Sequence, residues 1–180
     1  MKLADPEKSC AVLIGASAYG DPGLNELPAV TNNVTRLGEL LMDHDVWGLP
    51  EERCIRVPEP KTLVELLDPI HEAARAATDT LFVYFAGHGL IHPTDINTLL
   101  LALPTTNPPR PYTAVDFAQV RAVVRSSAPD VNRLVVLDCC YAGRAFDGGM
   151  NGSSDEVILA QQARIGGRTC SPHAPPPGKL

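Results

Sequence analysis

Short apolar runs alternate with amphipathic segments along this chain. Runs rich in β-branched and aromatic residues cover 10–15, 54–57, 82–86 and 133–138. Uninterrupted runs of this length are typical of strands buried on both faces of a parallel sheet. Between them, apolar residues recur at helical spacing within 30–41, 63–70 and 120–124. Strands that alternate with helices predict an α/β fold, with a mainly parallel sheet sandwiched by helices.

Local signals refine the helix boundaries. Thr62 with Glu65 three positions later resembles a capping box. Pro69 predicts either a kink or a restart of that helix, with Asp68 as the new cap. Thr113 with Asp116 predicts the start of the next helix. Asn32 and Asn33 lie near the start of the first helix, where they are candidates to cap or flank it.

The remaining segments are predicted from their composition. Residues 16–29 and 91–97 are predicted to be loops, and 98–103 a short strand or hairpin. Four prolines between 104 and 111 predict a rigid exposed connection. Residues 144–156, rich in Gly, Ser and Asp, predict a loop, and 157–163 are either one or two helical turns or an edge strand.

Polar, reactive residues follow two of the apolar runs. Gly87-His88-Gly89 ends the third run, and Asp138-Cys139-Cys140 ends the fourth. Chemistry collects at the carboxyl ends of strands in open α/β sheets, so the His and the Cys are candidates for one site. An imidazole can take the proton of a thiol and so activate it as a nucleophile. The amides of Gly89 and Cys140 are candidate donors to an oxyanion.

The two motifs, Tyr-Phe-Ala-Gly-His-Gly and Asp-Cys-Cys-Tyr-Ala-Gly, resemble those of the caspase and metacaspase group of cysteine peptidases, in a bacterial-type version. The resemblance covers roughly residues 8–143, and the 52 positions from His88 to Cys140 fit the separation of about 50 residues in caspases. It implies that Cys140 is the nucleophile and His88 its partner. Because successive strand side chains point to opposite faces, Cys139 is then assigned to packing.

The same resemblance implies a substrate-binding pocket. Asp138 falls where metacaspases hold a basic side chain at P1, the substrate residue before the cleaved bond. The alternative for Asp138 is a helix-cap or loop role. Where metacaspases usually carry an Asn-Asp pair, this chain has Asn32-Asn33, so Asn33 is the second substrate-binding candidate and the pocket is less acidic than usual.

Composition limits the partners. The 180 residues carry 21 acidic and 15 basic side chains, a net charge of −6, with no Lys or Arg run, which argues against nucleic acid and anionic membranes. No apolar stretch is long enough to span a bilayer, and the polar N-terminus is unlike a signal peptide. Five cysteines, two of them adjacent, suit a reducing compartment, so we expect a cytoplasmic protein.

No organic cofactor is needed for this chemistry. The family resemblance allows activation by Ca²⁺, although the sequence shows no clear calcium loop. A zinc site built from His88, His92, Cys139 and Cys140 is the alternative. The absence of a Cys-x-x-Cys spacing disfavours it.

The domain organisation follows from the resemblance and, for the tail, from its composition. Residues 1–143 correspond to the catalytic core, 144–171 to a linker-type activation loop and the start of a small-subunit-like part, and 172–180 to a Pro-rich disordered tail. Caspase-like domains carry about two further strands and helices after the nucleophile, so we expect part of the C-terminal subdomain to be lacking.

The resulting hypothesis is a cysteine endopeptidase that cleaves proteins or peptides after Arg or Lys. The resemblance also implies an effector of a bacterial stress or defence system, with a regulatory or sensing partner. Two alternatives remain. One is a catalytically silent scaffold module, and the other is a half-enzyme that needs a missing C-terminal part or a partner.

Overall fold

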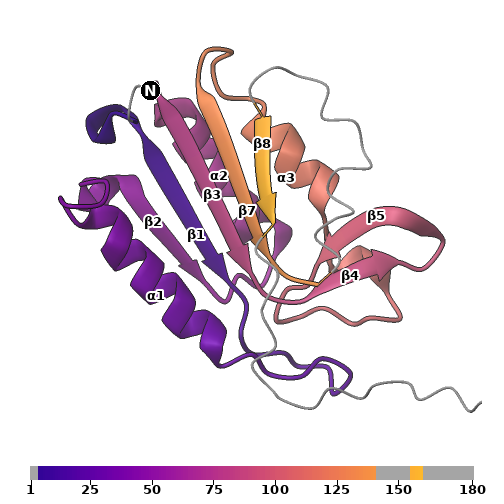
Figure 1. Ribbon diagram of the computed structural model, residues 1–180. Helices are drawn as coiled ribbons and strands as arrows, with labels where there is room; N and C mark the ends of the chain where they lie inside the picture. Colours follow the sequence, from indigo (N-terminus) through magenta and orange to yellow (C-terminus); the bar gives the residue numbers. More distant parts are fainter. Residues whose placement is uncertain (1–3, 141–154, 160–180) are drawn as a thin grey trace, which may run out of the picture.

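A five-stranded parallel sheet organises the chain. The computed structural model describes residues 4–140 and 155–159. The strand order is β2-β1-β3-β7-β8, and every neighbouring pair runs parallel (Figure 1). This confirms the mainly parallel sheet predicted from the apolar runs. The strands are β1 (Cys10–Gly15), β2 (Cys54–Pro58), β3 (Thr80–Ala86), β7 (Asn132–Asp138) and β8 (Asp155–Leu159).

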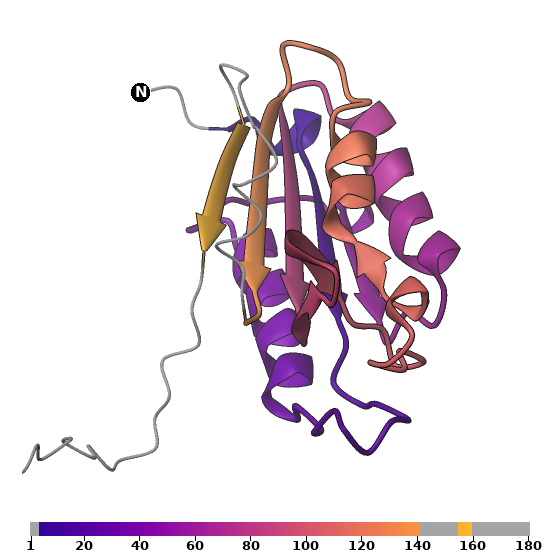
Figure 2. The same cartoon turned by 90° about the vertical axis from the view of Figure 1, so that its right-hand side faces the viewer.

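Helices cover both faces of this sheet. Helix α1 (Ala29–Met42) lies on one face, and α2 (Leu63–Ala76) and α3 (Phe117–Val124) lie on the other (Figure 2). Alternate strand residues therefore enter two separate cores. Val83 and Phe85 pack with α2 and α3, whereas Phe82 and Tyr84 pack on the α1 side. No helix in the described part of the chain is long and apolar enough to cross a bilayer.

A small antiparallel sheet begins shortly after the carboxyl end of β3. Its order is β4-β5-β6, with β4 (Gly89–His92), β5 (Asp95–Leu101) and β6 (Val115–Asp116) (Figure 1). The prediction of a loop over 91–97 is therefore wrong, because these residues form most of a hairpin. The start of β5 is exposed, so it shows no alternation of apolar and polar positions.

Helix α2 begins as predicted but continues further. The Thr62 side chain accepts a hydrogen bond from the Glu65 amide at 3.2 Å, while the Glu65 carboxylate accepts from the Lys61 amide at 2.9 Å. The cap is therefore present without the reciprocal bond of a full capping box. Pro69 lies inside an unbroken helix, so a restart capped by Asp68 is wrong.

Helix α3 begins later than predicted. A 3-10 turn (Pro111–Thr113) and β6 precede it, and the Asp116 carboxylate accepts from the Ala118 amide at 2.8 Å as the cap. Two further 3-10 turns cover Pro6–Lys8 and Glu51–Arg53.

The predicted domain boundaries after Gly143 lie almost wholly outside the described residues. Within that region the structure describes the backbone of β8, which pairs with β7 at the sheet edge. This agrees with an edge strand, rather than helical turns, over 157–159. The predicted loop over 144–156 is wrong at residues 155 and 156, which belong to β8, and the rest of it, like the predicted tail over 172–180, lies outside the described residues.

We expect the sheet-facing side of α2 to dominate its contribution to stability. Leu66 is 0% exposed, so Leu66→Ala should lower the free energy of unfolding by about 3 kcal/mol, measured by urea denaturation. Leu63, in the same helix, is 37% exposed, and Leu63→Ala is the matched control with a loss below about 1 kcal/mol. Equal losses would contradict the packing of α2 against the sheet.

Candidate active site

The register of β3 and β7 brings their two motifs together. Ala86 pairs with Asp138, and the Gly87 amide donates to the Asp138 carbonyl at 3.3 Å. His88 and Cys140 each lie two residues beyond this pair, on neighbouring strand tips. A Cβ atom added to Gly89 would collide with the Cys140 carbonyl oxygen and lie 3.0 Å from Cys139 Sγ. The backbones of Gly89 and Cys140 are therefore in contact at the carboxyl ends of the two strands, and His88 directly precedes Gly89.

The imidazole of His88 is held by a backbone carbonyl. Its Nε2 lies 2.8 Å from the carbonyl oxygen of Asn25, in the loop between β1 and α1. A carbonyl oxygen can only accept, so Nε2 carries the proton and the neutral ring keeps its lone pair on Nδ1. That nitrogen is then the one able to take a proton from a thiol.

Tyr19, in the same loop, holds both the ring and the backbone of His88. The two ring centroids are 4.8 Å apart, and the His88 amide donates to the Tyr19 hydroxyl oxygen at 3.0 Å. The hydroxyl itself donates to the Ala16 carbonyl at 2.7 Å. Burial raises the pKa of Tyr19 to about 12, with a further contribution from the negative charge of Glu59. Tyr19 therefore stays neutral and keeps both hydrogen bonds.

Glu59, between β2 and α2, anchors the start of this loop. Its Oε1 accepts from the Ser17 amide at 2.9 Å and from the Ser17 hydroxyl, and its Oε2 accepts from the Ala18 amide at 3.3 Å. Glu59 has a φ of 51°, the one positive value at a non-glycine residue in the described part of the chain. This backbone costs on the order of 1 kcal/mol, and the bonds to Ser17 and Ala18 offset the cost.

Asn25, Tyr19 and Glu59 were not identified from the sequence. Asn25 acts through its carbonyl, which every residue has, and the other two act from loops whose course no local pattern reveals. The one sequence signal for these contacts is the pair of glycines around His88, which indicates that other residues pack closely there. At Gly87, for example, a Cβ atom would lie 3.0 Å from the Tyr19 hydroxyl, which indicates a neighbour close by.

The three residues of the second motif have different surroundings. Cys139 is buried in the core on the α2 and α3 side, which confirms its assignment to packing. Burial raises the pKa of its thiol to about 12, and the neighbouring Cys140 and Asp138 add to the shift. Cys140 is exposed just past the strand end. It is therefore the accessible thiol of the pair.

Asp138 lies on the α1 side, where two donors meet one of its oxygens. Oδ2 accepts from the Tyr84 hydroxyl at 3.0 Å and from the Asn33 side-chain amide at 3.5 Å. Oδ1 is buried and has no hydrogen-bond partner among the described residues. Asp138 itself is 6% exposed and is the last residue of β7, so it is not a helix cap.

Asn33 reaches this carboxylate from inside α1. The helix begins at Ala29, with Pro28 at the N-cap position and no side-chain capping bond. The alternative that Asn32 and Asn33 cap or flank the helix is therefore wrong. Both predicted substrate-binding residues, Asp138 and Asn33, lie together, and the structure adds Tyr84 to them.

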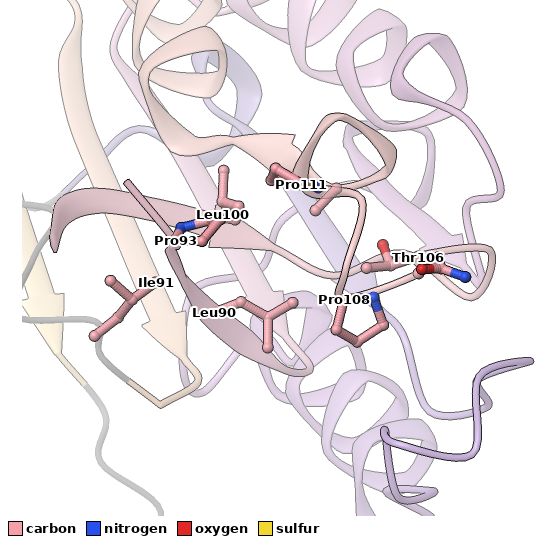
Figure 3. A pocket seen from close by; sticks show the side chains of 9 residues that line it. Leu90, Ile91, Pro93, Leu100, Thr106, Pro108 and Pro111 are labelled. Carbon is pink, nitrogen blue, oxygen red and sulfur yellow. The ribbon is translucent and has the colours of Figure 1, made fainter. Parts of the chain in front are cut away.

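Two hollows lie beside the hairpin rather than at the strand tips. One, of roughly 300 Å³, has Leu90, Ile91 and Leu100 of the hairpin opposite Pro108 and Pro111 (Figure 3). The other, of roughly 850 Å³, shares Leu100 and Pro111 with it and extends toward α2. No residue of the two motifs lines either pocket. The candidate site is therefore assigned from the residues at the carboxyl ends of β3 and β7 and not from a pocket.

The zinc alternative finds no support in the arrangement of ligands. Over residues 4–140, no three His, Cys, Asp or Glu side chains are grouped closely enough to hold a metal ion. His92 lies on β4, where its Nδ1 faces the Thr94 amide at 3.4 Å. The four residues of the zinc alternative are therefore not gathered into a metal site.

In the described residues, a parallel sheet with helices on both faces is the architecture of the caspase class of folds. The family model for the caspase domain, peptidase family C14, matches residues 8–173. The chain therefore belongs to the caspase-domain peptidase family.

Solved structures agree on the fold. A crystal structure of a Geobacter sulfurreducens protein is 19% identical, with 74% of this chain and 50% of that chain covered and a TM-score of 0.57. The structure of pro-sf-caspase-1 is 14% identical, with 87% and 63% covered and a TM-score of 0.60. This chain thus spans less than two thirds of the length of either. A search of the curated proteins finds no match.

The contact between Gly89 and Cys140 leaves no room for a side chain. We expect Gly89→Ala to push the two strand tips apart and to destabilise the protein by about 1–3 kcal/mol, measured by urea denaturation. It should also change the rate at which Cys140 reacts with iodoacetamide. At Gly20 an added Cβ would meet its nearest atom at 3.6 Å, so Gly20→Ala is the control and should change neither value. A Gly89→Ala protein of unchanged stability would refute the contact.

Proposed function

We propose that this chain is a cysteine endopeptidase in which Cys140 and His88 form the catalytic dyad. The observation that carries the proposal is the bond from His88 Nε2 to the Asn25 carbonyl. This bond leaves Nδ1 as the basic nitrogen of the ring. His88 follows β3, and the exposed Cys140 follows the neighbouring strand β7. A nucleophile, a base and a group that orients the base are the parts that such a site requires.

The reaction would proceed by acyl transfer. His88 Nδ1 takes the proton of the Cys140 thiol, and the thiolate attacks the carbonyl carbon of the scissile peptide bond. The protonated His88 then gives its proton to the leaving amine, and water hydrolyses the thioester. The close approach of Gly89 to Cys140 supports the proposal that their amides donate to the oxyanion.

The substrate preference we propose is for basic residues at P1. Asp138 supplies a carboxylate on the α1 side of the same strand end, with one buried oxygen that has no donor among the described residues. A cation is the ligand that offsets the cost of such an oxygen. Asn33 contributes an amide where relatives usually have a second acid, so this preference should be weaker than in a site with two carboxylates.

The biological role we propose rests on family resemblance alone. It is that of an effector in a bacterial stress or defence system, controlled by a regulatory or sensing partner. Because the matched structures are longer, we propose as the active species either this chain alone or this chain completed by a further C-terminal part or by a partner.

Selective alkylation tests the dyad. We expect iodoacetamide at pH 8 to modify Cys140 before the other four cysteines, identified by peptide mass mapping. Cys139 should be protected, because its pKa is raised to about 12 and it is therefore a thiol at this pH. His88→Ala should slow the modification of Cys140 by roughly 100-fold, since a positioned base contributes about that much.

The matched control is His71→Ala, an exposed histidine on α2, which should leave the rate unchanged. Equal labelling of all cysteines, unaffected by His88→Ala, would favour the scaffold alternative. Hydrolysis of a positional-scanning peptide library by the wild type, and its loss in Cys140→Ala, completes the test.

A second carboxylate near Asp138 should strengthen the preference for basic P1 residues. Asn33→Asp adds a charge worth about 1 kcal/mol to a bound cation, so kcat/KM on basic peptides should rise roughly fivefold. Asn32→Asp places the same charge one position earlier, on an exposed residue, and should have little effect. An equal rise in both variants would indicate general electrostatic attraction instead of a specific pocket.

A further inference from the structure

The two oxygens of Asp138 are not equivalent. Oδ2 faces the Tyr84 hydroxyl at 3.0 Å and the Asn33 amide at 3.5 Å, whereas Oδ1 has no donor among the described residues. The Tyr84 hydroxyl is the closer donor to Oδ2, and the Asn33 amide lies at the outer limit of a hydrogen bond. Oδ1, which is buried, is the oxygen left without a donor among the described residues.

Tyr84 is a fixed donor in this arrangement. It lies on β3, two residues before Ala86, which pairs directly with Asp138. Ala86 is small, so the phenol can extend along the sheet to the carboxylate. Burial raises the pKa of Tyr84, and the negative charge of Asp138 raises it further. Its hydroxyl therefore remains protonated and continues to donate across the working range of pH.

Arginine and lysine respond differently to a carboxylate with one oxygen available. A guanidinium forms its strongest pair as a fork, with two parallel N–H bonds to both carboxylate oxygens. An ammonium is a compact charge that binds well to one oxygen. When Oδ2 already accepts from Tyr84, an arginine loses the second of its two bonds to the carboxylate. A lysine still forms its bond to the other oxygen.

From this asymmetry we propose that Tyr84 determines specificity and makes the site favour lysine over arginine at P1. The inference rests on the proposed function, because it requires Asp138 to bind the P1 side chain. Tyr84 acts through Asp138 and takes no part in the proton transfer itself.

The test compares two fluorogenic peptides that differ only in having Lys or Arg at P1. The wild type should show the higher kcat/KM on the Lys peptide. Tyr84→Phe keeps the ring and removes the donor to Oδ2, so kcat/KM on the Arg peptide should rise about tenfold relative to the Lys peptide, the effect of one charge-assisted hydrogen bond. Asn33→Ala, which removes the longer bond, should shift the ratio less and in the same direction.

The control is Tyr112→Phe, which removes the hydroxyl of a residue that is 80% exposed and should leave the ratio unchanged. A wild type that favours Arg, or an unchanged ratio in a folded Tyr84→Phe protein, overturns the inference while the peptidase function stands. If Tyr84→Phe does not fold, the inference is tested by the ratio of kcat/KM on the Lys and Arg peptides in the wild type and by its shift in Asn33→Ala. If the wild type cleaves neither peptide, basic P1 specificity fails and this inference fails with it, whereas the selective alkylation of Cys140 still reports on the dyad.

Discussion

The parallel pairing of β3 with β7 is the interaction on which the rest of the structure depends. It runs in register from Thr80 beside Asn132 to Ala86 beside Asp138. β3 is buried throughout and β7 at Val135, Leu137 and Asp138, so a slip of one residue would move side chains of one core into the other. Because that slip is so unfavourable, the residues just beyond each strand are fixed relative to one another although they are far apart in the sequence.

Because side chains alternate along β7, its last residues place different chemical groups on the two faces of the sheet. Asp138 faces α1 and joins Tyr84, whereas the next residue, Cys139, enters the core beneath α2 and α3. The strand ends there, and Cys140 is exposed. Three adjacent residues can therefore provide a carboxylate, a packing group and an accessible thiol without interfering with one another. The same alternation places Tyr84 on the side of Asp138, which the sequence pattern of β3 could have indicated.

The sequence predicts most of the central sheet because long apolar runs have few other possible structures. It fails over Ile91–Asn97, since a hairpin that projects from the core carries no clear alternation. For the candidate site, the motifs indicate which residues lie at strand ends. They do not reveal what holds them, because the contacts of Tyr19, Asn25 and Glu59 come from loops and from a backbone carbonyl. These contacts depend on tertiary structure that local periodicity does not encode.

The position of Glu59 has a consequence for how the candidate site is connected to the rest of the sheet. This residue follows β2, one of the two outer strands of the described sheet, and its carboxylate holds the loop that contacts His88, just past the end of the central strand β3. The bonds of Glu59 to Ser17 and of Tyr19 to His88 therefore link the end of β2 to the residues after β3 through one loop. Glu59, with its positive φ, thus connects the end of an outer strand to the loop that holds His88.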